Sequence, residues 1–100
     1  MTEKYKVTIH SEMGPRDGIL KLNCQGKCIT GSLDLIGYIN TVCGMQAEAE
    51  TLRLFHPIKT AVSTLSCETV LRLHGGDLCG MTTSNAAHMR WEGILLRQER

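Results

Sequence analysis

The sequence predicts an all-β protein: a small, closed, eight-stranded antiparallel barrel in up-and-down order, built from two four-stranded halves. Two observations support this fold class. Apolar and polar residues alternate with a period of two along most of the chain, and an internal repeat relates its first half to its second. A chain of 100 residues accommodates one domain, which we expect to span residues 1–100.

The first strand is predicted from the alternation around Tyr5, Val7 and Ile9, which are separated by lysine and threonine. These three side chains share one face because successive side chains of a strand point to opposite faces. The strand is expected to end at residues 14–18, Gly-Pro-Arg-Asp-Gly, whose composition is typical of a turn.

The internal repeat predicts two equivalent hairpins. An offset of 49 residues matches three pairs of glycines: Gly26 with Gly75, Gly31 with Gly80, and Gly44 with Gly93. In each copy, an alternating apolar segment leads into a glycine-containing turn and a second alternating segment follows. The expected inward residues are Leu20, Leu22, Cys24, Ile29, Leu33 and Leu35 in one copy, and Cys67, Thr69, Leu71, Leu73 and Leu78 in the other. Gly31 and Gly80 fall mid-strand on the inward face, where a closing barrel requires sharp coiling.

Further strands follow from the same alternation. One is expected over about residues 38–45 and the last over about 87–96, with Met89, Trp91 and Leu95 inward. Eight short strands separated by turns are typical of a sandwich or a barrel. Closure removes the two unpaired edges that an open sheet would keep, so we expect the barrel.

The fifth strand is predicted around Leu52 and Leu54, which alternate with polar residues. It should stop near Pro57, because proline cannot donate a hydrogen bond to the ladder. Residues 46–54 are also compatible with a helix, and one helical turn there is the competing interpretation.

Composition excludes several partner classes. The net charge is +1 and basic residues are interleaved with acidic ones, which argues against nucleic acid as a partner. The polar start of the chain is not followed by the apolar core of a signal peptide, and no stretch approaches the roughly 20 apolar residues of a membrane span. We therefore expect no membrane partner and a cytoplasmic protein. Five irregularly spaced cysteines predict reduced thiols rather than a disulfide framework.

Cysteine and histidine spacing does not predict a metal site. Cys24 and Cys28 are four residues apart, but structural zinc normally uses paired short spacings, and His74 with Cys79 does not supply one. The strand alternation around the intervening turn also puts Cys24 and Cys28 on opposite faces. We expect no metal and no cofactor.

A nucleophilic cysteine–histidine pair is conceivable among five residues, but the sequence cannot place two of them in contact. The candidates are Cys43, Cys67, Cys79, His56 and His88. An inward cysteine is more often a small apolar core residue. With no assembled nucleophile, base and oxyanion donors, we expect no catalytic residue and no enzyme activity.

Four residues are candidates for a ligand site in the barrel lumen: Trp91, His56, Tyr5 and Met89. Trp91 is the single tryptophan, and we place it inward beside Met89, opposite Val42 and Tyr5. Packing in the core is the favoured role for these side chains. A tryptophan in a barrel lumen can also form the wall of a site for a small apolar ligand.

The acidic alternation Glu48-Ala49-Glu50 lies on the expected connection between the fourth and fifth strands. Such a run is usually only a solvated tip. Two carboxylates on a protruding loop also suit contact with a basic protein partner, because binding groups concentrate on loops. Glu48 and Glu50 are therefore the candidate partner-binding residues.

Short motifs in the first half of the chain resemble the GrlR-like repressors, small regulators of type III secretion genes. The motifs are Gly18-Ile19-Leu20, then Gly26 followed by Ile29-Thr30-Gly31, and later Gly44, the acidic stretch and the strand with Leu52 and Leu54. The resemblance covers about residues 5–56 and is architectural beyond them.

The resemblance implies a cytoplasmic, lipocalin-like barrel that forms a homodimer and binds a transcriptional regulator through an exposed acidic loop. Glu48 and Glu50 match the two glutamates of that loop, whereas Ala49 and Thr51 replace its two aspartates, which halves its charge.

Two functions follow as hypotheses. The first is a non-enzymatic regulator that acts through protein–protein contacts at Glu48 and Glu50. The alternative is a carrier or sensor of a small apolar ligand held in the lumen near Trp91, because an eight-stranded barrel can hold one small ligand or be filled by side chains.

Overall fold

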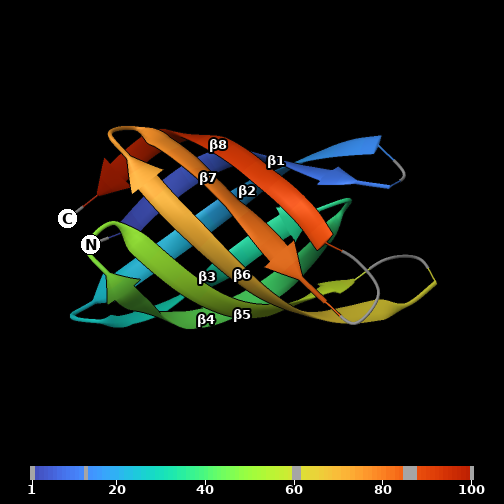
Figure 1. The fold of residues 1–100 in the computed structure, drawn as a ribbon, viewed down its shortest axis with the longest axis horizontal. Coiled ribbons are helices and arrows are strands. Elements are labelled where there is room, and N and C mark those ends of the chain that lie inside the picture. The colour runs from blue at the N-terminus through green and yellow to red at the C-terminus, as the bar shows by residue number, and fades with distance from the viewer. Residues whose placement is uncertain (1, 13, 60–61, 85–87, 100) are drawn as a thin grey trace.

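A computed structural model describes residues 2–12, 14–59, 62–84 and 88–99, and these form a closed eight-stranded antiparallel barrel in up-and-down order (Figure 1). The strands are β1 (Thr2–Ser11), β2 (Gly14–Gln25), β3 (Cys28–Leu35), β4 (Tyr38–Glu48), β5 (Thr51–Lys59), β6 (Thr64–His74), β7 (Asp77–Thr83) and β8 (His88–Glu99). Each strand pairs with the next, and β8 returns to pair with β1. The predicted fold class is confirmed.

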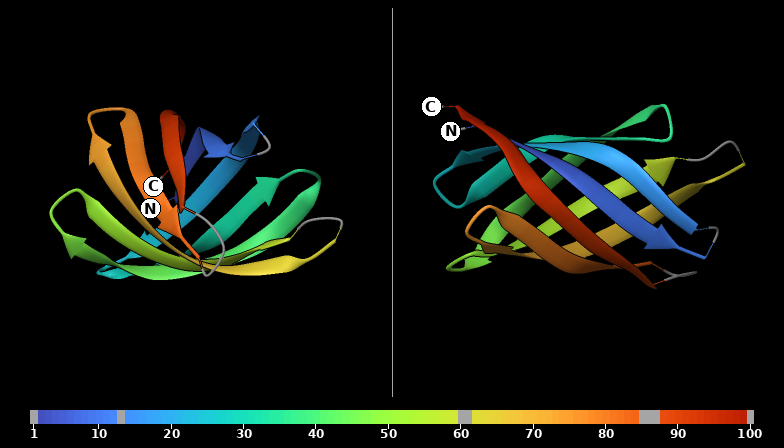
Figure 2. Two further views of the ribbon diagram at one scale, coloured as in Figure 1. Left: turned by 45° about the vertical axis from the view of Figure 1, so that its right-hand side comes forward. Right: turned by 90° about the horizontal axis from the view of Figure 1, so that it is seen from above.

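The two ends of the barrel differ in what they carry. The first and last strands lie side by side, with Thr2 paired to Glu99, so both described chain ends are at one end, the termini end (Figures 1 and 2). The β2–β3, β4–β5 and β6–β7 turns lie there too. The opposite end carries the β1–β2, β3–β4, β5–β6 and β7–β8 connections. None of the described residues forms a helix long and apolar enough to cross a membrane.

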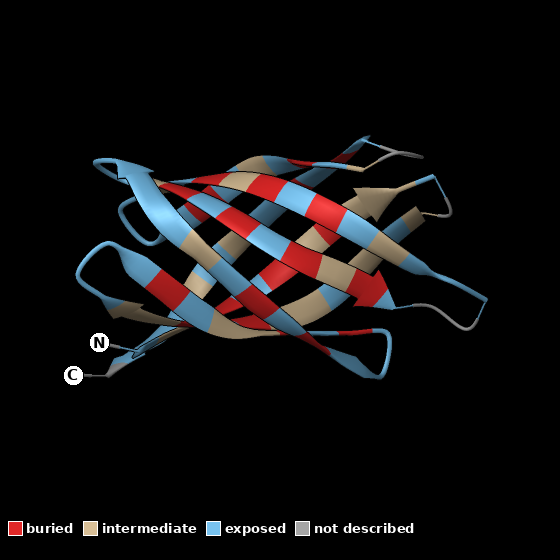
Figure 3. Ribbon diagram, turned by 90° about the horizontal axis from the view of Figure 1, so that it is seen from below, coloured by how far each residue is buried: buried red, intermediate tan, exposed pale blue. Residues whose placement is uncertain are grey.

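The lumen is filled by inward side chains, which alternate with outward ones along the strands (Figure 3). The strand period of two puts every second residue on the inner face, and closure brings the eight inner faces together. The buried hydrophobic core is Tyr5, Val7, Ile9, Leu20, Leu22, Ile29, Leu33, Leu35, Val42, Leu52, Leu54, Ile58, Cys67, Leu71, Leu78, Met89 and Trp91. The predicted inward faces are therefore correct.

The 49-residue repeat is a structural repeat. Gly26 and Gly75 occupy equivalent turns with the same backbone angle, φ 64°, which glycine adopts without strain. Gly31 and Gly80 lie where neighbouring strands approach closely. A Cβ atom at Gly31 would overlap the carbonyl oxygen of Lys21, and one at Gly80 would overlap the equivalent carbonyl in β6.

Replacing Gly31 with alanine is expected to lower the free energy of unfolding by about 2 kcal/mol, because adding a methyl group to a tight site costs about 1–3 kcal/mol. Gly76→Ala is the matched control. The nearest atom to a Cβ at Gly76 is Leu95 Cβ, at 4.0 Å, so its effect should stay within about 0.5 kcal/mol. Urea unfolding of both variants measures the difference, and equal losses would contradict the close-approach argument.

Segment 14–18, expected to be a turn, is instead the first part of β2. Pro15 pairs with His10 of β1 there. The β3 strand ends opposite Gly18, so residues 14–17 have only β1 as a neighbour. Proline is tolerated at such a free edge because no ladder bond is required from its missing N–H.

Two other sequence interpretations differ from the structure. Residues 46–54 form two strands and a tight turn, so the helical interpretation is wrong. The β5 strand continues past Pro57 to Lys59, paired with β6. The last strand begins at His88, and the predicted start at residue 87 lies outside the described residues.

Candidate functional site

The wall of the barrel is incomplete between β4 and β5. Their pairing runs from Glu48 and Thr51 at the turn to Cys43 and Phe55, and then stops. Among the described residues, 38–42 of β4 have no ladder partner in β5, although they stay paired with β3. We call this stretch the β4–β5 seam.

Pro57 accounts for the seam. The backbone N–H of Lys59 points toward β4, where the side-chain oxygen Oδ1 of Asn40 accepts it at 3.0 Å. Backbone groups of alternate residues point to the same side of a strand, so Pro57, two residues earlier, also faces β4. Because proline has no N–H to donate, the ladder loses a bond there. The sequence prediction therefore identified the right residue, but Pro57 interrupts one ladder without ending the strand.

The Asn40 side chain replaces the missing ladder. Its Nδ2 donates to the carbonyl oxygens of Leu33, at 3.1 Å, and Tyr38, at 3.5 Å, while its Oδ1 accepts from Lys59. Asn40 is fully buried, with 0% exposure, and its bond to Leu33 is buried as well. One amide thus ties β3, β4 and β5 together. Sequence reasoning missed this residue, whose only signal was a polar side chain at an inward position.

Four buried side chains behind the seam form one hydrogen-bonded chain across the lumen. Trp91 Nε1 donates to Thr82 Oγ1 at 2.6 Å, and the hydroxyl oxygens of Thr82 and Thr69 lie 2.5 Å apart. Thr69 Oγ1 lies 2.6 Å from His56 Nε2. His56 Nδ1 lies 3.1 Å from the carbonyl oxygen of Pro57, at the seam. The chain therefore connects the seam to the centre of the core.

The chemistry of the end groups determines the proton positions in this chain. The Pro57 carbonyl can only accept, so His56 Nδ1 donates and Nε2 of the neutral ring accepts. Thr69 then donates to His56 and accepts from Thr82, whose oxygen accepts the indole N–H. Every donor has an acceptor, and no buried side-chain polar atom in the described part of the chain lacks a partner.

Burial lowers the pKa of His56, although its bond to the Pro57 carbonyl opposes the shift. Protonation would place a second N–H opposite Thr69, which then could no longer donate to the ring. Thr69 would have to donate to Thr82 instead, and the Thr82 hydroxyl hydrogen would lose Thr69 as its acceptor. The hydrogen-bonded chain thus favours the neutral ring.

The free energy of unfolding is expected to fall as the pH drops below about 6.5, the ordinary pKa of histidine. In that range the unfolded His56 takes up a proton, whereas the folded one, with its lowered pKa, stays neutral, so protons stabilise the unfolded state. The loss should reach about 1 kcal/mol one pH unit lower. Urea unfolding at about pH 7.5 and 5.5 should show this loss in the wild type and not in His56→Gln. Equal pH dependence in both proteins would contradict it.

His56 and Cys67 are direct cross-strand partners, one of the cysteine–histidine pairs that the sequence left open. They do not form a nucleophile and base. Both ring nitrogens are engaged elsewhere, and the thiol of Cys67 donates to the Leu65 carbonyl at 3.9 Å. Burial raises the pKa of the Cys67 thiol, which disfavours the nucleophilic thiolate.

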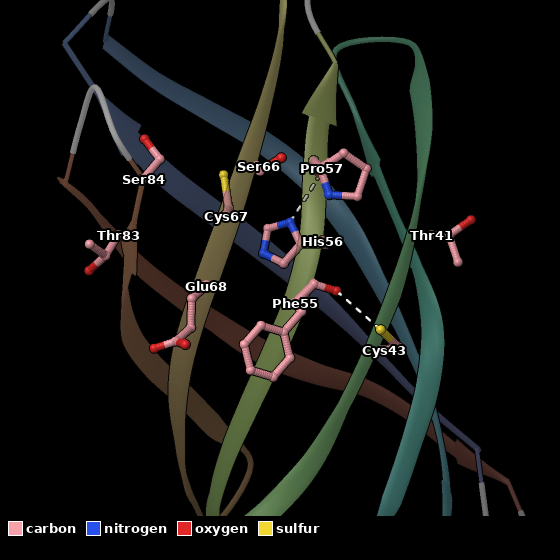
Figure 4. Close-up of a pocket in the computed structure, with 10 residues that line it drawn as sticks. All are labelled: Thr41, Cys43, Phe55, His56, Pro57, Ser66, Cys67, Glu68, Thr83 and Ser84. Atoms are coloured by element: carbon pink, nitrogen blue, oxygen red, sulfur yellow. Dashed lines mark hydrogen bonds between the residues drawn. The ribbon is translucent and has the colours of Figure 1, made fainter.

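A hollow of about 570 Å³ lies over the seam and the adjoining part of β6 (Figure 4). Its apolar lining comes from Phe55, Pro57 and Cys43, and its one charged lining residue is Glu68. His56 and Cys67 line it from the inner face of the barrel, and hydroxyl side chains complete the rim. The full lining is Thr41, Cys43, Phe55, His56, Pro57, Ser66, Cys67, Glu68, Thr83 and Ser84. We call it the seam hollow.

Two of the four predicted lumen residues meet directly. The rings of Trp91 and His56 pack edge to face, with centroids 5.8 Å apart and an interplanar angle of 65°. Trp91 is 1% exposed, and Met89 is buried on the same strand. Trp91 is therefore a packed core residue, and the lumen beside it is occupied by side chains.

Tyr5 lies farther along the barrel than the sequence predicted. The register sets Trp91 beside Ile9 and Gly80, whereas Tyr5 pairs with Leu95, toward the termini end. The hydroxyl of Tyr5 donates to Glu3 Oε2 at 3.1 Å, and burial raises the pKa of the phenol. Tyr5 is thus a neutral core residue in another layer. Strand register, which sequence periodicity does not specify, accounts for the error.

Glu48 and Glu50 are both exposed, but the connection that carries them is a tight turn and not a protruding loop. Glu48 is the last residue of β4 and pairs with Thr51, and a bulge after Gln46 adjusts the register. Glu50 has a positive φ of 63°, and its carbonyl accepts the backbone N–H of Leu73 at 2.8 Å.

Cys24 and Cys28 lie on opposite faces of the wall: Cys24 pairs with the buried Ile29, and Cys28 is exposed. Over residues 2–12, 14–59, 62–84 and 88–99, no group of three histidine, cysteine or acidic side chains gathers to hold a metal ion. All five cysteines are free thiols.

Comparison with known proteins supports the fold and leaves the family open. No family model matches the chain, and no curated protein matches it. The GrlR-like resemblance is therefore not supported at the level of a family.

Several solved structures share the architecture at low identity. A redesigned beta barrel, b11L5F_LGL, is 14% identical with a TM-score of 0.70, covering 96% of this chain and 90% of that one. The redesigned beta barrel mFAP1, bound to DFHBI, is 15% identical with a TM-score of 0.65, covering 94% and 92%. Apo lipid binding protein 8 from Caenorhabditis elegans is 12% identical with a TM-score of 0.50, covering 79% and 70%. The chain is thus a small eight-stranded antiparallel β-barrel that resembles redesigned barrels and a lipid-binding protein.

Proposed function

We propose that this protein is a non-enzymatic binding barrel that takes up a small, largely apolar molecule at the seam hollow. The observation that carries the proposal is the interrupted β4–β5 ladder, which leaves a hollow whose lining includes the core residues His56 and Cys67. The similar barrels add support, since one was solved bound to DFHBI and another is a lipid binding protein. A non-enzymatic role fits the occupied nitrogens of His56 and the raised pKa of the Cys67 thiol.

The seam hollow is a better candidate than the lumen beside Trp91. The lumen is packed, and its polar groups already satisfy one another. The seam hollow instead exposes apolar surface, above all Phe55, which is 40% exposed although phenylalanine normally contributes to a core. An apolar floor with a few polar rim groups is typical of small-molecule sites.

Titration of the protein with 1-decanol, followed by amide chemical shifts, tests this proposal. Saturable shifts should centre on Phe55, His56 and Cys67. Phe55→Thr should weaken binding about tenfold, because removing buried apolar contact of one side chain costs on the order of 1.5 kcal/mol.

Met81→Thr is the matched control, because Met81 is an exposed apolar residue on β7, 46% exposed, that does not line the seam hollow. It should leave the decanol affinity unchanged. Unsaturable shifts, or equal effects of the two variants, would overturn the proposal. As an independent measurement, native mass spectrometry of protein purified from cells shows whether a bound small molecule accompanies the chain.

A second candidate is a cytoplasmic, homodimeric regulator that binds a transcriptional regulator through Glu48 and Glu50. What favours it is that both carboxylates are exposed at the tip of one turn. Affinity capture from the source cell with the wild type and with Glu48→Lys plus Glu50→Lys tests this function. A partner lost with the double variant would support it, and identical partner lists would refute it. Analytical ultracentrifugation tests the dimer.

A further inference from the structure

We infer that the seam hollow selects amphiphiles with a cationic head group over those with a carboxylate, and that Phe55 and Glu68 together hold the cation. The inference rests on the proposed binding function and adds the charge of the ligand to it. Three properties of the hollow support it: an aromatic–carboxylate pair at its wall, two buried lining side chains whose donors are already engaged, and the position of the nearby basic residues.

Phe55 and Glu68 are direct cross-strand partners on β5 and β6. Both are outward and exposed, and both line the seam hollow from neighbouring strands (Figure 4). Side chains directly opposite each other on neighbouring strands have Cβ atoms about 4.5–5.5 Å apart. An ammonium group between them would meet the negative face of the ring on one side and the carboxylate on the other.

Glu68 is free to take this role. Over the ranges that the structure describes, no lysine, arginine or histidine forms an ion pair with it. An ammonium ligand would therefore not have to displace a cation of the protein. The Phe55 ring increases the selectivity of the hollow for cations over anions, because a cation is attracted to the face of the ring and an anion is repelled.

The two buried side chains that line the hollow, His56 and Cys67, have no free donor for an anion. His56 stays neutral because burial lowers its pKa, and its Nδ1–H is already donated to the Pro57 carbonyl. The Cys67 thiol donates to the carbonyl of Leu65. A ligand carboxylate would thus lose hydration without gaining a hydrogen bond or a positive charge from either of these two side chains, which is unfavourable.

The nearest basic side chains along β5 are Arg53 and Lys59, which flank the hollow on the outward row. Each lies two residues beyond a lining residue, Phe55 and Pro57 respectively, and neither lines the hollow itself. Because neither side chain lines the hollow, both should affect affinity less than Glu68, which does line it.

Three ten-carbon probes that differ only in the head group test the inference: decylamine, 1-decanol and sodium decanoate, each titrated at about pH 7.5 below its micelle concentration. Isothermal titration calorimetry and amide shifts should give decylamine an affinity about tenfold higher than decanol, with decanoate the weakest. Glu68→Gln should reduce decylamine to the affinity of decanol while leaving decanol unchanged. Asp34→Asn, which changes an exposed carboxylate near the end of β3 outside the hollow, is the matched control and should preserve the preference.

The outcomes separate this inference from the proposed function. If no probe binds saturably, the function and the inference are both overturned. If decanol and decanoate bind as well as decylamine, or if Glu68→Gln leaves the preference intact, the inference is wrong and the binding function stands. Phe55→Leu, which keeps apolar volume without the ring, should reduce the preference for decylamine more than the affinity for decanol; an equal reduction would exclude the role of the ring.

Discussion

Replacing Trp91 with alanine is expected to lower the free energy of unfolding by about 4 kcal/mol, within the range of about 3–5 kcal/mol found for large aromatic truncations in cores. Trp91 is 1% exposed, packs edge to face on His56 and donates its indole N–H to Thr82. Truncation would remove the largest buried side chain of the lumen and leave a cavity at the meeting point of the two barrel halves. Urea unfolding measures the loss.

Two further variants divide that loss between packing and hydrogen bonding. Trp91→Phe keeps an aromatic ring but leaves Thr82 without its donor, so it should cost about 1–2 kcal/mol. Met81→Ala truncates an exposed apolar residue on β7 and should cost less than about 1 kcal/mol. A loss for Trp91→Ala below about 2 kcal/mol would mean that the lumen is loosely packed, and would restore it as a candidate ligand site.

The fold could be predicted from the sequence because its main determinants are local. The period-two pattern assigns inner and outer faces residue by residue, and closure then places every inner face in one lumen. The repeat also predicts where the backbone requires glycine. The structure confirms this at the paired turns of Gly26 and Gly75 and at the close strand approaches of Gly31 and Gly80.

The errors concern register and hydrogen-bond partners, which the period does not specify. The sequence predicts Tyr5 opposite Trp91, although the register separates them by four residues along β8, where Tyr5 pairs with Leu95. Thr69 was predicted to point inward, but its partners on two neighbouring strands, Thr82 and His56, become visible only in three dimensions.

The seam shows that the effect of a proline depends on which neighbouring strand its nitrogen faces. The sequence predicts that Pro57 cannot join a ladder, and the simplest consequence is the end of the strand. In the structure β5 continues because its ladder with β6 does not need the proline N–H, and only the side facing β4 is lost. The compensating Asn40 lies in a different strand, so no pattern around Pro57 could have identified it.

Asn40→Leu is expected to cost about 3 kcal/mol, the second largest effect that we foresee. Leucine has the same branched heavy-atom skeleton as asparagine but is bulkier and cannot hydrogen-bond, so the part-buried N–H of Lys59 and the carbonyl of Leu33 lose their partner. Each buried group left unsatisfied costs about 1–3 kcal/mol. Thr41→Val, at the next and exposed position of β4, is the control and should stay within about 0.5 kcal/mol.

Hydrogen exchange gives this prediction a local readout. In the wild type the Lys59 amide is held by Asn40 Oδ1, so it should exchange slowly, and in Asn40→Leu it should exchange much faster than amides in the β1–β2 ladder. A Lys59 amide that stays protected, together with a loss below about 1 kcal/mol, would show that Asn40 does not hold the seam. If Asn40 does hold it, the interruption at Pro57 is stabilised by a dedicated side chain, which is the condition for a lasting opening in an otherwise closed barrel.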